Sequence, residues 1–282
     1  MKLKLSCADF SFPRLEHDQA LGVIALLGLR GADIGLFEGH GHLKPSAELR
    51  RPAASGARLQ RRLAGHGLKA ADIFLQLHAG FDELAINHPE AGRRAAAGEQ
   101  FLRALDYADA AGAAHITILP GVTFPGETRA DGVARSVDEL NRRVAEARAA
   151  KLQLAVEPHV GSLADTPERA LDLVKRVPGL GLTLDYAHFT RAGMADERIE
   201  PLTQLATHLH ARAARRGRLQ APLKKNTIDF PRMVEALARR QFAGWMALEY
   251  VWIDWEHCNE VDVISETVQL KNLLLAAAEK IK

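Results

Sequence analysis

Short runs of hydrophobic residues alternate along this chain with longer stretches of mixed polar and apolar residues. The runs are mostly apolar on consecutive positions, which is typical of parallel strands that are buried on both faces. They predict eight strands, at Leu3–Ala8, Ala32–Leu36, Asp72–Leu77, His115–Leu119, Leu152–Glu157, Gly181–Asp185, Thr207–Ala211 and Trp245–Tyr250.

The stretches between the runs are rich in Ala, Leu, Arg and Glu and have helical periodicity. They predict helices that include Pro89–Ala113, Val133–Ala150, Pro167–Val174, Phe230–Arg240 and Ile264–Lys282. Ser136, with Glu139 three residues later, resembles a capping box, and Thr166 before Pro167 resembles an N-cap with proline at the first helical position. The apolar run at positions 21–29 is too short to span a bilayer, so we interpret it as the buried face of a first helix.

Eight strands that alternate with helices over 282 residues, with no shift in composition, predict a single-domain (β/α)8 TIM barrel over residues 1–282. A doubly wound open sheet is the alternative. It is weaker because it gives no reason for polar residues at the ends of four successive strands to converge.

Composition excludes several classes of function. A net charge of +2 is too small to indicate a nucleic-acid or anionic-membrane partner. Cys7 and Cys258 give no disulfide framework. Charged residues precede the first apolar run and no small-residue cleavage site follows it, so we expect a cytoplasmic protein.

Four strands in the second half of the chain end on residue types that bind divalent ions. Because the carboxyl ends of parallel strands meet at one mouth of a barrel, residues far apart in sequence can surround one ion there. The four are Glu157, Asp185, His210 and Glu249, a set suited to Mn, Mg, Co or Zn. Taken singly, Glu157 could be a surface carboxylate and Asp185 a helix N-cap, and either His208 or His210 could be the ligand.

These segments resemble the sugar isomerase/epimerase superfamily with the xylose-isomerase-like TIM barrel. That group includes ketose 3-epimerases, inosose dehydratases, hydroxypyruvate isomerases and 3-dehydroshikimate dehydratases, and endonuclease IV is a distant relative. The resemblance covers essentially the whole chain. It is strongest in AVEPHVGSLADTPERALDLV, LTLDYAHF, HLHARAARRG and IDFPRMVEALARRQFAGWMALEY.

The resemblance implies that one ion is held by Glu157, Asp185, His210 and Glu249, and that Glu157 and Glu249 also serve as the acid/base pair. It further implies proton transfer through an ion-stabilised enediolate. Such chemistry would make the chain an isomerase or epimerase of a keto sugar or small hydroxy-carbonyl compound. The alternatives are a lyase, such as an inosose or 3-dehydroshikimate dehydratase, and a non-catalytic sugar-binding barrel.

The resemblance also implies residues that bind the substrate. His188, in the family's Asp-x-x-His segment, and Arg216 are expected to reach substrate oxygens, although the basic run around Arg216 is also typical of a solvated surface. His40 and His78 follow the second and third strands and are expected to line the pocket, with a second metal site as an alternative. Endonuclease IV needs an Asp-x-His pair where this chain has PLKKNT, so DNA repair is not expected. Relatives suggest a homodimer or homotetramer.

Overall fold

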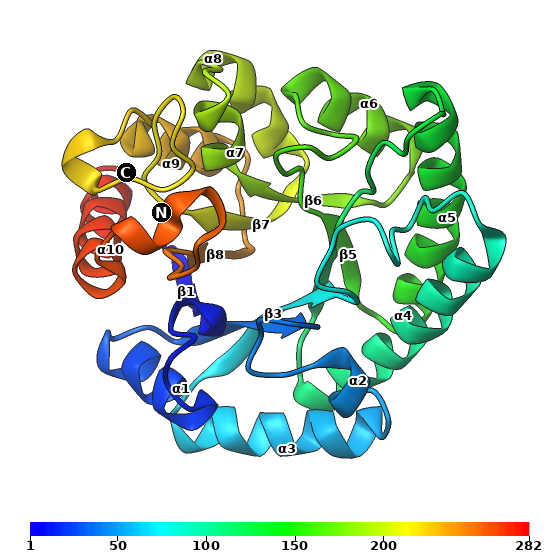
Figure 1. The fold of residues 1–282 in the computed structure, drawn as a ribbon. Coiled ribbons are helices and arrows are strands. Elements are labelled where there is room, and N and C mark those ends of the chain that lie inside the picture. Colours follow the sequence, from blue (N-terminus) through cyan, green and yellow to red (C-terminus); the bar gives the residue numbers. More distant parts are fainter. Residues whose placement is uncertain (282) are drawn as a thin grey trace.

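Eight parallel strands form a closed barrel, with each strand hydrogen-bonded to its neighbours in chain order and β8 paired to β1. We describe the fold from a computed structural model that covers residues 1–281 (Figure 1). The strands are β1 Lys4–Ala8, β2 Gly31–Phe37, β3 Lys69–Gln76, β4 His115–Ile118, β5 Gln153–Val156, β6 Gly181–Asp185, β7 Ala206–Ala211 and β8 Trp245–Leu248. The predicted TIM barrel is confirmed, and closure pairs both edges of each of its strands.

Helices surround the barrel and cover the outer faces of the strands (Figure 1). The α-helices are α1 His17–Leu26, α2 Pro45–Glu48, α3 Pro52–Gly65, α4 Ala91–Ala111, α5 Arg129–Ala149, α6 Pro167–Arg176, α7 Tyr186–Arg191, α8 Asp196–Ile199, α9 Phe230–Arg239 and α10 Val263–Glu279. Short 3-10 helices are η1 Asp9–Ser11, η2 Glu200–Gln204, η3 Leu223–Lys225 and η4 Trp255–Glu260.

All eight predicted strands are present, with ends that differ by a few residues, and the predicted N-cap at Thr166 is confirmed because its side chain accepts from the Arg169 amide. The capping box predicted at Ser136 was wrong. Helix α5 begins two turns earlier, where Thr128 and Asp131 form the box, and the Ser136 hydroxyl donates instead to the Pro120 carbonyl. The predicted last helix ends before Lys282, which lies outside the described residues.

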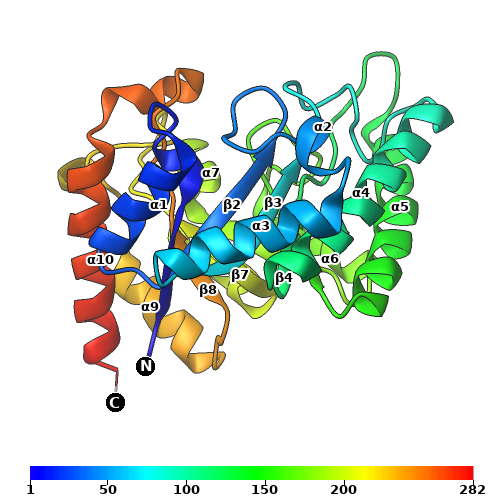
Figure 2. The same cartoon turned by 90° about the horizontal axis from the view of Figure 1, so that it is seen from below.

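The strand direction fixes where polar strand ends can meet. Both termini lie at one end of the barrel (Figure 2), and because all strands run parallel, their carboxyl ends lie at the opposite end. Register adds precision there, since Asp185 on β6 pairs directly with His210 on β7. The barrel therefore brings together residues that are far apart along the chain.

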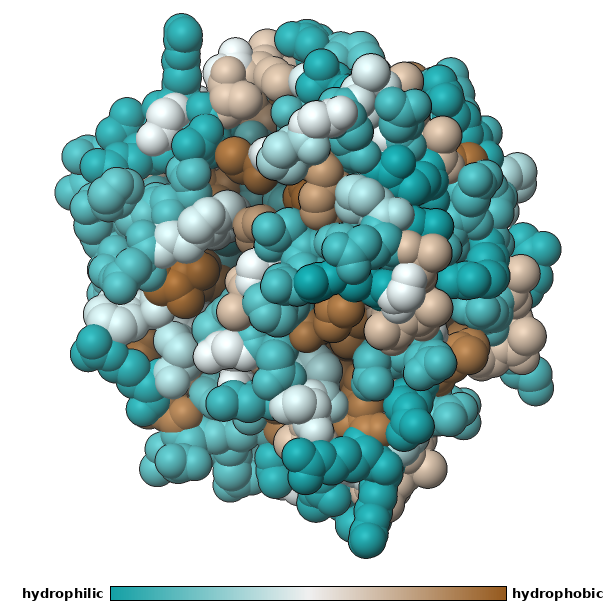
Figure 3. Space-filling view, turned by 45° about the vertical axis from the view of Figure 1, so that its right-hand side comes forward, coloured by the Kyte–Doolittle hydropathy of each residue, from teal (hydrophilic) through white to brown (hydrophobic). Residues whose placement is uncertain are grey.

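The surface seen in Figure 3 is largely hydrophilic, and hydrophobic residues show mainly in its hollows. Within residues 1–281, helices long and apolar enough to cross a membrane are absent. Apolar side chains instead fill the space between barrel and helices, where Leu21, Ile34 and Phe101 are buried. Since this space is packed, a functional site is expected among the loops at the carboxyl ends of the strands.

Candidate metal and catalytic site

Three side chains from the carboxyl ends of β5, β7 and β8 meet at the base of the barrel mouth. His210 Nδ1 lies 2.6 Å from Glu157 Oε1 and 3.0 Å from Glu249 Oε2. We call Glu157, His210 and Glu249 the floor cluster. Each is at least 95% buried, so two carboxylates share one imidazole with little exposure to solvent.

Burial and charge shift the pKa values of this cluster in different directions. Burial raises the pKa of Glu157 to about 7. Burial also acts to raise the pKa of Glu249, but the Arg212 guanidinium and His210 outweigh it and hold that pKa below its ordinary value. Burial acts to lower the pKa of His210, yet the carboxylates of Glu249 and Glu157 hold it well above its usual range. The two glutamates therefore have unequal surroundings.

Asp185, at the end of β6, is linked to an arginine rather than to the floor cluster. Arg212 donates from Nε and Nη2 to Asp185 Oδ2, at 3.1 and 2.7 Å, and Nη2 also lies 3.4 Å from Glu249 Oε2. The other oxygen of Asp185 accepts from the Ala187 amide and caps α7, as the sequence had allowed. Arg212 is only 3% exposed, so its guanidinium is a fixed cation between two carboxylates.

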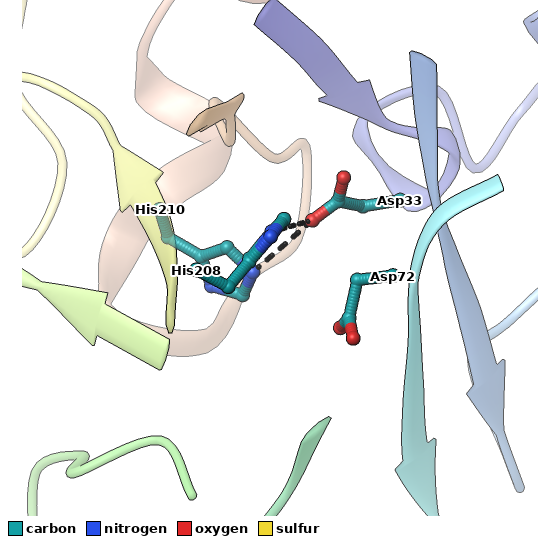
Figure 4. Close-up of side chains that lie close together, drawn as sticks. All are labelled: Asp33, Asp72, His208 and His210. Atoms are coloured by element: carbon teal, nitrogen blue, oxygen red, sulfur yellow. Dashed lines mark hydrogen bonds and ion pairs between the residues drawn. The ribbon is translucent and has the colours of Figure 1, made fainter. Parts of the chain in front are cut away.

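A second set of buried polar side chains lies in the barrel interior: Asp33, Asp72, His115 and His208, which we call the inner cluster. Figure 4 shows the Asp33 carboxylate, from β2, facing both His208 and His210 on β7. His208 Nε2 is hydrogen-bonded to Asp33 Oδ2, whereas His210 Nε2 lies 3.5 Å from the same oxygen. Of the two histidines, His210 is therefore the one that contacts Glu157 and Glu249, and His208 belongs to the inner cluster.

The inner cluster is largely paired within itself. The Ser6 hydroxyl donates to Asp33 Oδ1 at 2.7 Å. His115 contacts Asp72 through Nδ1 at 2.6 Å and the Thr207 hydroxyl through Nε2 at 2.9 Å. Asp33 and Asp72 are fully buried, and such carboxylates need these partners to remain in the interior.

The floor cluster fits a divalent ion. Donor atoms of Glu157, His210 and Glu249 lie within 4.8 Å of one another, and so do donor atoms of Glu157, Asp185 and His188. Glu249 Oε2 and His210 Nε2 are buried and, within residues 1–281, have ion-pair neighbours at 3.0–3.5 Å but no hydrogen bond. Buried polar atoms without a hydrogen bond are rare, and a bound ion is one way to satisfy them. Donor atoms of Asp33, Asp72, His208 and His210 also lie within 4.8 Å of one another, although most of that set is already paired.

A cavity of about 380 Å³ opens above the floor cluster. Glu157, Glu249 and Arg212 line it, together with two of the predicted substrate-binding residues, His188 and His40. Burial lowers the pKa of both histidines, so both favour the neutral form.

Two other predicted substrate-binding residues lie outside this cavity. His78 lines a neighbouring hollow between β3 and α4, where its Nδ1 accepts from the Gly80 amide. Arg216 packs near Gly193 and lines a separate depression beside α8. The arginine that reaches the carboxylates is Arg212, four residues earlier.

Sequence reasoning missed three residues of this region. Arg212 was treated only as part of a basic run, and its position on the same strand face as His208 and His210 was the available signal. His159 lines the cavity two residues after Glu157, and burial lowers its pKa to about 4. Asp33 gave a weaker signal, because a lone aspartate in an apolar strand does not reveal its partner.

Comparisons with known proteins agree with this architecture. A family model described as "Xylose isomerase-like TIM barrel" matches residues 22–272. A search of curated proteins gives no match.

Solved structures with the same fold include a D-psicose 3-epimerase from Clostridium cellulolyticum H10 with D-tagatose (TM-score 0.76, 16% identity, 98% of this chain and 99% of that one). The IolI protein with a bound zinc atom is similar (TM-score 0.75, 16% identity, 99% of both chains). So is the 3-keto-D-glucoside 4-epimerase YcjR from E. coli (TM-score 0.72, 15% identity, 98% of this chain and 100% of that one). At these identities the likeness shows the fold.

Proposed function

Since this chain belongs to the xylose isomerase-like TIM barrel family, we propose that it is a divalent-metal-dependent isomerase or epimerase of a keto sugar or small hydroxy-carbonyl compound. One observation carries the proposal. Glu157 and Glu249 approach one nitrogen of His210 from two different strands, at the base of a cavity large enough for a small ligand.

Glu157 and Glu249 are the proposed acid/base pair. One carboxylate takes the proton from the carbon that carries the hydroxyl group, and the electron pair left behind moves into the neighbouring carbonyl to give an enediolate. Return of a proton to the opposite face of that carbon gives epimerisation, and return to the adjacent carbon gives isomerisation. A bound Mn, Mg, Co or Zn ion would polarise the carbonyl and stabilise negative charge.

In this proposal Glu157, His210 and Glu249 hold the ion, with Asp185 as the fourth ligand. Asp185 shares its Oδ2 with Arg212, so this position depends on how the guanidinium is placed. Arg212 also provides a fixed positive charge beside the enediolate oxygens, where prearranged charge is most effective. Neutral His188 and His40 are placed to hydrogen-bond substrate oxygens.

The test combines ion analysis with solvent exchange. We expect about one divalent ion per chain and deuterium incorporation from D2O into a hydroxy ketone. We expect the Glu157→Gln, Glu249→Gln double variant to lose both. Glu168→Gln is the matched control, because Glu168 is exposed and pairs with Arg198 on the surface, whereas the floor cluster is buried.

Each failure has a separate meaning. Wild-type protein that stays free of ions after incubation with Mn, Mg, Co and Zn contradicts the proposed ion site. Protein that binds an ion but exchanges no proton on ketoses, inososes or dehydroshikimate contradicts the enediolate mechanism. Release of water from a substrate together with exchange identifies the lyase instead.

A further inference from the structure

The cavity above the floor cluster has two chemically different ends. Its base is polar and contains Glu157, Glu249 and Arg212. Its sides carry five aromatic rings, which we call the aromatic wall: Phe10, Phe37, Phe74, Phe81 and Trp255. Four of the chain's ten phenylalanines and one of its three tryptophans thus surround one cavity. The sides of the cavity are therefore largely apolar.

The rings pack on one another and extend down to the base. The ring centroids of Phe10 and Phe37 are 4.8 Å apart, and those of Phe37 and Phe74 are 5.1 Å apart. Phe74 in turn lies 5.7 Å from the His210 ring. A ligand whose oxygens reach the floor cluster therefore meets aromatic carbon immediately beyond them.

A second pair of rings completes the wall on the loop side. Phe81, after β3, lies 6.1 Å from Trp255, in η4, in an edge-on arrangement. Trp255 also lies 6.2 Å from the His188 ring. These two rings come from loops that follow different strands, so the apolar surface continues around the mouth.

Most side chains on the sides of the cavity are apolar. Away from Glu157, Glu249 and Arg212, and within residues 1–281, its polar side chains are His40, Gln76, His159 and His188. The Gln76 amide is partly engaged, since it donates to the Ala79 carbonyl at 3.5 Å. A sugar hydroxyl placed against the aromatic wall gives up hydrogen bonds to water and regains one only where it reaches an imidazole such as His159 or His188. An open-chain ketose would place several hydroxyls there.

The charged residues of the cavity also limit which ligands it can bind. Arg212 is the one Lys or Arg among the described residues that line the cavity, and Asp185 and Glu249 already pair with it. A phosphate or carboxylate on the ligand would find no unpaired cation from the chain at this site. The cavity thus favours a neutral ligand.

We infer that the substrates of this site are neutral 2-hydroxy ketones whose far end is apolar, such as an aryl or alicyclic group, and not open-chain or phosphorylated sugars. The inference rests on the proposed function for the reacting end. The hydroxy ketone oxygens face the floor cluster, and the apolar group packs on the aromatic wall.

The experiment compares three probes: 1-hydroxy-4-phenylbutan-2-one, D-fructose and dihydroxyacetone phosphate. Deuterium incorporation next to the carbonyl is followed by NMR with enzyme loaded with Mg or Zn. We expect kcat/KM for the aryl probe to exceed that of the other two by at least about 10-fold, the scale on which an apolar subsite discriminates. A smaller ratio, or a preference for the sugar or the phosphate, overturns the inference.

Failure of the proposed function is recognised separately. If no probe exchanges, the enediolate mechanism fails, and the Kd values of the same probes, from ligand-observed NMR, then decide the inference. Binding of the aryl probe at least about 10-fold more tightly than that of D-fructose supports it, and any smaller ratio overturns it.

A double variant and its control test which side chains produce the preference for the aryl probe. In the Phe81→Ser, Trp255→Ser variant we expect the aryl preference to fall at least about fivefold, because two rings of the wall are gone. Leu26→Ser is the matched control, since Leu26 is 88% exposed on α1, and it should keep the full preference. A double variant that folds and keeps the full preference contradicts the assignment of these rings.

Discussion

The barrel contains two buried groups of carboxylates and histidines, and they differ in access. Glu157 and Glu249 of the floor cluster line the cavity, whereas Asp33 and Asp72 of the inner cluster have no exposed surface. The inner carboxylates are held by Ser6, His208 and His115, and the Glu249 carboxylate is held by ion pairs with His210 and Arg212. Burial and pairing of charged groups are therefore common to both clusters, and position beside a cavity distinguishes the candidate catalytic site.

The largest effect is expected from removal of a floor carboxylate. Glu249→Gln keeps the shape of the side chain but removes its charge and its ability to take a proton. We expect the exchange rate to fall about 1,000-fold, within the range for loss of a general acid or base. The fall is measured under saturating ion, so that lost binding and lost chemistry are separated. A decrease of less than tenfold would mean that Glu249 takes no proton in the reaction.

A smaller effect, on ion binding, is expected from the residue that links the clusters. Asp33 lies 3.5 Å from His210 Nε2, and a carboxylate behind a ligating histidine orients the ring and raises its basicity. Asp33→Asn should therefore weaken ion affinity about 10–100-fold while the fold is retained. Titration with a chromophoric chelator measures the affinity, and circular dichroism checks the fold. Unchanged affinity would show that the inner cluster is independent of the site.

Substitution in the inner cluster is expected to lower the stability of the fold rather than the affinity for the ion. Asp72→Asn weakens the contact with His115 Nδ1, which is buried, so the free energy of unfolding should fall by about 1–3 kcal/mol. Urea unfolding measures this change. Ion affinity should stay within about threefold of wild type, because charged groups away from the ion act weakly on it. A loss of ion stoichiometry would instead place a second ion at Asp33, Asp72 and His208.

The barrel could be predicted from the sequence because each of its strands is specified by residues that are neighbours in the chain. Each apolar run specifies a buried strand, and eight such runs alternating with helices specify closure, so all eight strands were found. The strand ends Glu157, His210 and Glu249 followed from the same rule, since parallel strands end at one mouth. Asp33 was missed because its partners lie on β1 and β7, and its contact with His208 spans 175 positions of sequence.

The arginines show the same limit at shorter range. Three of the basic residues in the β7 loop, Arg212, Arg215 and Arg216, fall within five positions, and the family resemblance favoured Arg216. Arg212 directly follows β7 and its guanidinium reaches Asp185 and Glu249, while Arg216 lies in the loop and lines a depression beside α8. The end of the strand at Ala211 was predicted correctly, so the error lay in choosing among the arginines after it, whose side-chain directions the sequence does not specify.

The smallest effect is therefore expected from substitution of Arg216, and substitution of Arg212 provides the contrast. Arg216→Ala removes a side chain that lies outside the cavity, so KM and kcat should stay within about twofold of wild type, as for surface changes away from the site. Arg212→Lys keeps the charge but not the fork that pairs Asp185 through two nitrogens, and Lys and Arg are not equivalent at such positions. Its kcat should fall about 10-fold or more, since it removes a prearranged donor beside the developing charge. If Arg216→Ala raises KM while Arg212→Lys is silent, the substrate is held by the loop, and the role of fixed cation passes from Arg212 to Arg216.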